Sequence, residues 1–115
     1  MGSILKASII GIFVFVVACL PPILHFITGP LGPIIGGFVG GTVVKATPRL
    51  ALAIGGCMGG IGIFVCIGGL AVIMNDFVQD AAGVLQVVVV SSVGGLYVGL
   101  FGGLGALIAA KLSRK

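Results

Sequence analysis

Ionisable side chains that could carry out chemistry are scarce in this chain of 115 residues. There is one histidine, His25, beside a Gly-Pro-rich stretch, and the two acidic residues are Asp76 and Asp80. His25 could bond backbone carbonyls at a membrane boundary, or it could contact a metal ion or proton shared with a partner subunit. One histidine cannot form a metal site alone. Asp76 and Asp80 lie between apolar runs, where they are typical of helix N-caps.

The uncharged polar residues of the last apolar run are the other candidates. Gln86, Ser91 and Ser92 stand inside it and fit either hydrogen bonds between helices or a solute path. No phosphate-binding loop, Cys-x-x-Cys pair or Ser/His/Asp set is present. The sequence therefore predicts no cofactor and no enzyme acting on its own, because catalysis in a membrane needs ionisable groups within the spans.

The three cysteines do not form a disulfide or zinc pattern. Cys19, Cys57 and Cys66 lie within apolar runs and are expected to act as small apolar side chains. Val16–Cys19 resembles a lipoprotein cleavage box, which raises lipidation at Cys19 as an alternative. Leu20–Pro22 places two prolines directly after it, where cleavage is disfavoured.

Composition excludes a soluble domain. Hydrophobic residues make up 59% of the chain and charged residues 7%, and the mean hydropathy is +1.41. A soluble domain has roughly a quarter charged residues, so this chain cannot cover a water-facing surface. The basic residues are separated by apolar runs and form no stripe, which excludes nucleic acid as a partner.

Four apolar segments, at about 7–24, 33–44, 48–74 and 81–112, are the predicted spans of a single domain. The second segment is short, because 12 helical residues cover about 18 Å of a hydrocarbon core of about 30 Å. It could be a re-entrant half-helix. Alternatively, the Gly-Pro-rich stretch 28–32 completes the crossing as irregular backbone. Such backbone must be buried against protein or a polar cavity, since lipid cannot satisfy its polar groups.

The charges favour four crossings. With the N-terminus cytoplasmic, all six basic residues then fall on the cytoplasmic side and both aspartates fall outside. A re-entrant second segment would instead place five of the six basic residues outside. We therefore predict an all-α, multi-pass protein of the cytoplasmic membrane, a bundle of four transmembrane helices with both termini cytoplasmic. The basic residues are Lys6, Lys45, Arg49, Lys111, Arg114 and Lys115.

Glycine makes up 22 of 115 residues, and in the second, third and fourth segments small residues recur at every fourth position and so line one helix face. Small-xxx-small ridges allow helix backbones to approach closely in lipid. The ridges either hold the four helices of one chain together or also dock a partner, and the sequence leaves both open. The predicted packing residues are Gly32, Gly36, Gly40, Gly55, Gly59, Ser91, Gly95, Gly99 and Gly103.

The run Gly29–Gly41, with a proline, an apolar pair, two glycines and a small residue, resembles a family of uncharacterised, glycine-rich archaeal membrane proteins of similar length. The similarity covers residues 7–65. The Lys45–Arg49 loop is shorter here than in the family. Because the family is a domain of unknown function, the resemblance implies a membrane fold and supplies no active residues.

These features predict a structural role. The leading hypothesis is a small accessory subunit that packs through its glycine faces against a larger membrane complex or against itself. The alternative is a homo-oligomeric channel or small-solute transporter, with the Gly-Pro-rich stretch, His25, Gln86 and the two serines near its path. The expected partners are the lipid bilayer and other integral membrane subunits or further copies of the chain.

Overall fold

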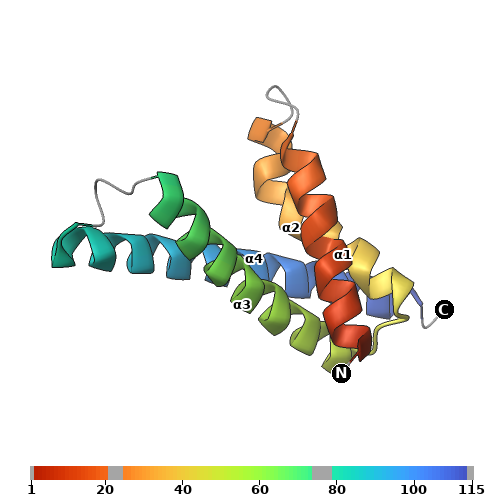
Figure 1. The fold of residues 1–115 in the computed structure, drawn as a ribbon. Helices are drawn as coiled ribbons and strands as arrows, with labels where there is room; N and C mark the ends of the chain where they lie inside the picture. Colours follow the sequence, from red (N-terminus) through yellow and green to blue (C-terminus); the bar gives the residue numbers. More distant parts are fainter. Residues whose placement is uncertain (1, 21–24, 74–78, 114–115) are drawn as a thin grey trace.

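The protein is all-helical throughout the part that the computed structural model describes, residues 2–20, 25–73 and 79–113, with the side chains of residues 18–19 and 25–29 excepted. This confirms the predicted all-α fold class. Residues 21–24, the predicted end of the first segment, lie outside the described residues, as do Asp76, Arg114 and Lys115. The described helices are α1 (Gly2–Cys19), α2 (His25–Val43), α3 (Pro48–Ile73) and α4 (Ala81–Leu112) (Figure 1).

Short polar signals determine where α3 and α4 begin. Thr47 precedes Pro48, and its hydroxyl oxygen accepts a hydrogen bond from Leu50 N at 3.4 Å. Pro48 has no N–H to leave unpaired at the first helical position. Asp80 caps α4, because its carboxylate accepts from Gly83 N at 2.8 Å. Both caps use a side-chain oxygen, so Thr47 and Asp80 can be recognised in the sequence as residues that favour helix starts.

The prediction that residues 28–32 are irregular backbone is wrong, because α2 runs through both Gly-Pro pairs and contains Pro30 and Pro33. Contacts with two other helices stabilise α2 despite the hydrogen bonds that its prolines remove. The hydroxyl of Tyr97 on α4 donates to the carbonyl oxygen of Pro30. Pro33 is fully buried, and Gly32 lies against the ring of Phe15 on α1.

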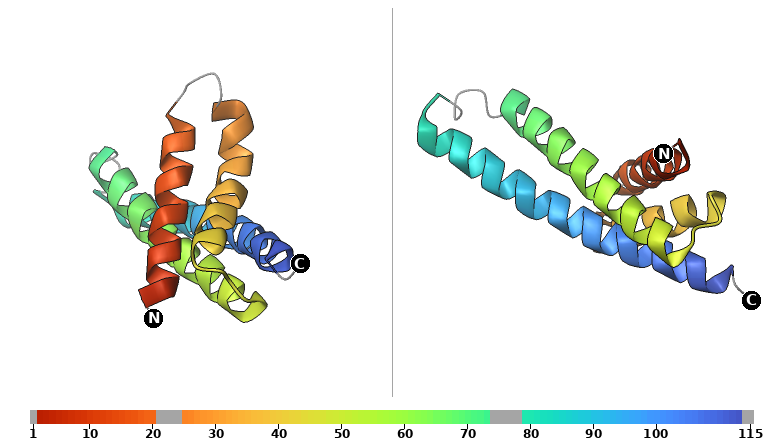
Figure 2. Two further views of the ribbon diagram at one scale, coloured as in Figure 1. Left: turned by 90° about the vertical axis from the view of Figure 1, so that its right-hand side faces the viewer. Right: turned by 90° about the horizontal axis from the view of Figure 1, so that it is seen from below.

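The four helices form two hairpins, α1–α2 and α3–α4, which cross at a steep angle (Figures 1 and 2). The most extensive contact is between α3 and α4. The α1–α2 hairpin packs on one side of the α3–α4 pair. The C-terminal ends of α1 and α3 lie well apart (Figure 1). Bundles of the usual kind keep their helices within about 20° of one another, so this arrangement differs from a parallel bundle.

The core lies where the hairpins cross. Met58 of α3 is fully buried, and its sulfur lies 3.1 Å from the position of a β-carbon at Gly11 of α1 and 2.9 Å from one at Gly102 of α4. Nearby, the Ser8 hydroxyl donates to Ile54 O at 3.4 Å and joins α1 to α3. The other buried members of the cluster are small or aliphatic, namely Ala7, Ala46, Ala51, Val98, Ala106 and Ala110.

Two described helices, α3 and α4, are long and apolar enough to cross a membrane. The described apolar parts of the other two helices, Gly2–Val17 and Pro30–Val43, are shorter. Large apolar side chains cover the exterior, and Phe64 and Val72 of α3 are 78% and 80% exposed. An apolar exterior of this extent is expected where lipid or a partner covers it.

Candidate functional site: the outer groove of α3 and α4

Glycine brings α3 and α4 into backbone contact. A β-carbon at Gly55 would lie 2.7 Å from Gly103 Cα, and one at Gly59 would lie 2.9 Å from Gly95 O. Gly99 lies between these contacts, since a β-carbon there would be 3.0 Å from Gly55 O. The predicted ridge residues of these two helices therefore face one another within the chain.

The glycines of α2 contact two different helices. A β-carbon at Gly36 or Gly40 would overlap backbone atoms of Gly11 or Ala7 on α1. The adjacent Gly37 faces a different helix, since a β-carbon there would overlap the carbonyl oxygen of Gly102 on α4. The double glycines of α2 thus place one helix between two neighbours, because consecutive residues point about 100° apart.

Gly102 and Gly105 of α4 are packing residues that the predicted ridge omits. Gly105 lies against the backbone of α2, where a β-carbon would overlap Ile34 O. The sequence signal is a second row of small residues, offset from the ridge of Ser91, Gly95, Gly99 and Gly103. That row continues through Ala106, Ala109 and Ala110, which are all buried.

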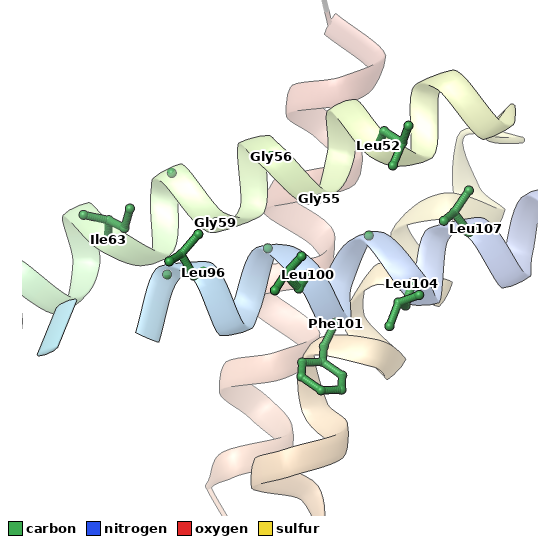
Figure 3. Close-up of a pocket in the computed structure, with 14 residues that line it drawn as sticks. Leu52, Gly55, Gly56, Gly59, Ile63, Leu96, Leu100, Phe101, Leu104 and Leu107 are labelled. Carbon is green, nitrogen blue, oxygen red and sulfur yellow. The ribbon is translucent and has the colours of Figure 1, made fainter. Parts of the chain in front are cut away.

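An apolar groove of about 710 Å³ runs along the outer side of α3 and α4 (Figure 3). Glycines of both helices form its floor, and exposed leucines form its walls, with Leu52, Leu96 and Leu100 each more than 60% exposed. The α1–α2 hairpin passes behind these helices in the close-up (Figure 3). Nothing within the described chain fills the groove. Its other lining residues are Gly55, Gly56, Gly59, Gly60, Ile63, Gly95, Gly99, Phe101, Gly103, Leu104 and Leu107.

Gly56 and Gly60 distinguish this groove from the inner contacts. A β-carbon at either position would meet no atom within 4 Å, although both residues directly follow glycines that are in close contact with α4. Helical glycine is about 1 kcal/mol less favourable than alanine. No contact within the described chain compensates for this difference at Gly56 and Gly60.

The polar candidates do not converge on one path. Gln86 is exposed on α4, and the Ser92 hydroxyl donates to Val88 O of its own helix at 2.7 Å. Ser91 is fully buried in the row of α4 residues that faces α3, and its hydroxyl has no hydrogen-bond partner among the described residues. His25 is the first residue of α2. The side chains of His25 and Cys19 lie outside the described part of the chain.

Among the described residues, no three His, Cys, Asp or Glu side chains gather as metal ligands would. Cys57 and Cys66 are unpaired and half-buried. The Cys66 sulfur lies 3.7 Å from the position of a β-carbon at Gly94, an ordinary packing distance. Cys66 therefore packs as a small apolar group beside α4.

Removing the buried hydroxyl in Ser91→Ala is expected to raise the free energy of unfolding by about 1 kcal/mol, because an unpaired buried polar group costs at least that much. The measurement is unfolding of the purified chain in detergent with increasing sodium dodecyl sulfate. Ser92→Ala is the matched control and should change stability little, since its hydroxyl bonds only its own helix. A loss of stability in Ser91→Ala would contradict the assignment of an unpaired hydroxyl.

The chain matches no protein-family model, and searches of curated proteins and of solved structures found no similar sequence or fold. The resemblance carried by Gly29–Gly41 therefore stays a prediction.

Proposed function

We propose that this chain is a small, non-catalytic subunit of the cytoplasmic membrane that packs against a transmembrane helix of a larger protein complex. In this proposal all four helices cross the bilayer and both termini are cytoplasmic. The N-terminal end of α1, the α2–α3 connection and the C-terminal end of α4 lie at one end of the molecule (Figure 1). This end carries Lys6, Lys45, Arg49 and Lys111, as the positive-inside rule requires of a cytoplasmic face.

The lengths of α3 and α4 are compatible with tilted crossings. With 32 residues, α4 is about 48 Å long, and α3 with 26 is about 39 Å. Both exceed a hydrocarbon core of about 30 Å, and tilting accommodates the excess. The helices α1 and α2, with 18 and 19 residues, are about 27 and 29 Å long. In this proposal they cross with little tilt, and α3 and α4 are the tilted pair.

The observation that carries the proposal is the unfilled glycine floor formed by Gly56 and Gly60. Their four-residue spacing puts them on one face of α3, and that face is open. Association in lipid depends on close packing, because lipid is as apolar as the helices themselves. A helix seated between the leucine walls would contact this floor as closely as α4 contacts the inner row.

A channel has less support. Gln86 is exposed, Ser92 bonds its own helix and Ser91 lies in the α3–α4 contact. These positions do not define a common polar lumen among the described residues.

The test is native mass spectrometry of the tagged full chain, extracted from its own membrane in mild detergent. We expect a heteromeric mass that contains a larger membrane protein. Gly60→Leu should abolish this association, because its β-carbon meets no other described atom and the leucine side chain fills the floor of the groove. Gly69→Leu is the matched control, since Gly69 is equally open on α3 but lies outside the groove.

Each variant should retain the helical content and unfolding midpoint of the unchanged monomer. A bare monomer from the native membrane, or a complex that survives Gly60→Leu, would contradict the proposal. A homo-oligomer without a larger protein would direct attention to conductance measurements and the channel alternative.

A further inference from the structure

We propose that the basic end of the molecule binds the headgroups of anionic phospholipids. The basic end is defined by four exposed side chains, Lys6, Lys45, Arg49 and Lys111. This end is separate from the outer groove, and lipid binding there rests on the proposed membrane location but not on which protein the groove binds.

Helix contacts bring these four segments together. Ala7, which follows Lys6, lies against Gly40 near the end of α2. The next residue of α2, Gly41, lies against Ala109 of α4, where a β-carbon would be 3.1 Å from the Ala109 side chain. One buried cluster contains a residue within two positions of each basic residue. These cluster members are Ala7, Ala46, Ala51 and Ala110.

The basic end has no described acidic partner. Asp80 is the one carboxylate among the described side chains, and it lies at the start of α4, far from the C-terminal end of that helix (Figure 1). Four positive charges at one end of the molecule, with no described carboxylate beside them, create a positive potential there that attracts anions. Anionic lipids attract clusters of lysine and arginine next to membrane helices in this way.

The backbone conformation of Lys45 also points to a role for its side chain. Its φ angle is +51°, so its backbone adopts the left-handed conformation that closes α2. Ala46 N donates to Gly41 O at 2.9 Å across this turn. Glycine or asparagine is usual at such a position, because a β-carbon is unfavourable there. A chain that uses glycine at 22 other places has lysine here, and the property that distinguishes lysine from glycine in this turn is its charged side chain.

The neighbours of the basic residues favour a lipid over a soluble anion. Leu5 precedes Lys6, Val43 lies two residues before Lys45, and Leu112 follows Lys111; each of these apolar side chains is more than half exposed. Positive charge beside exposed apolar surface fits a ligand with an anionic headgroup and acyl chains. Inorganic phosphate or an acidic peptide would contact only the charges.

The test uses the purified full chain in neutral detergent, mixed with phosphatidylglycerol or phosphatidylcholine and examined by native mass spectrometry. We expect preferential retention of phosphatidylglycerol and a higher melting temperature with it. Each charge removed should weaken the preference about fivefold. The combined variant Lys6→Gln, Arg49→Gln, Lys111→Gln should abolish it, and raising the ionic strength should reduce it.

Lys45→Gly separates binding from folding. This variant should melt at a higher temperature than the unchanged protein in neutral detergent, because glycine adopts the left-handed turn without penalty. It should nevertheless retain less phosphatidylglycerol, whereas Lys45→Arg should retain the full amount. An unfolded variant could not show this combination.

Three results would overturn the proposal. One is equal retention of the two lipids. Another is a preference for phosphatidylglycerol that is unchanged both in Lys45→Gly and in the combined variant. The third is an equal rise in melting temperature with inorganic phosphate or an acidic peptide, which would assign the site to a soluble anion or a protein segment.

Discussion

Gly37→Ala is expected to lower the free energy of unfolding by about 2–3 kcal/mol, because overpacking at a close contact forces the backbone apart. A β-carbon there would overlap the carbonyl oxygen of Gly102, a backbone atom that cannot rotate away. Gly105→Ala should have a comparable effect, since its β-carbon would overlap Ile34 O on the same interface. Both substitutions separate the α1–α2 hairpin from α4.

The measurement is unfolding of the purified full chain in mixed micelles, followed by far-ultraviolet circular dichroism as the sodium dodecyl sulfate fraction rises. Gly68→Ala is the control. Gly68 is also helical but has no atom within 4 Å of its β-carbon position, so alanine should stabilise the helix there by up to about 1 kcal/mol. Unchanged stability in Gly37→Ala would mean that the hairpins do not meet at Gly37 and Gly102.

Local sequence signals predict the helices of the second hairpin well. Thr47 followed by Pro48 predicts the start of α3, and Asp80 is a suitable N-cap for α4. These signals act over one turn of chain and need no information about the rest of the fold. The α3–α4 connection is short, which favours an antiparallel pair of neighbouring helices.

The second helix shows where local reasoning fails. Pro30 and Pro33 oppose a helix, and from the sequence alone residues 28–32 are predicted to be irregular. The missing information is tertiary, since Tyr97 on α4 donates to Pro30 O and Phe15 on α1 covers Gly32. Contacts with partners distant in the sequence override local propensity, as they do for helices generally.

Glycine spacing predicts a packing face but not its partner. In α2, the first glycine of the pair Gly36–Gly37 meets α1 and the second meets α4. In α3, the first glycine of Gly55–Gly56 meets α4 and the second meets nothing in the described chain. The two pairs are identical in sequence, so the difference arises from how the hairpins cross, which depends on all of the contacts together.

The neighbouring glycines of α3 allow this difference to be measured. We expect Gly55→Ala to destabilise the isolated chain by about 2 kcal/mol, because its β-carbon would lie 2.7 Å from both Gly103 Cα and Gly99 O. Gly56→Ala should stabilise it by up to about 1 kcal/mol, since alanine is the better helix former and the site is open. Two substitutions of the same chemistry, one residue apart, should thus have opposite signs in mixed-micelle unfolding.

The pair Gly59 and Gly60 repeats the comparison one turn further along α3. Gly59→Ala should destabilise the chain, with its β-carbon 2.9 Å from Gly95 O, while Gly60→Ala should stabilise it. Equal effects within either pair would contradict the assignment of inner and outer faces. If the outer glycines bind a partner helix, Gly56→Ala and Gly60→Ala should also weaken that association while the monomer becomes more stable. A gain in monomer stability together with a loss of partner is the outcome that separates a docking face from lipid-facing surface, because a lipid-facing alanine would produce only the gain.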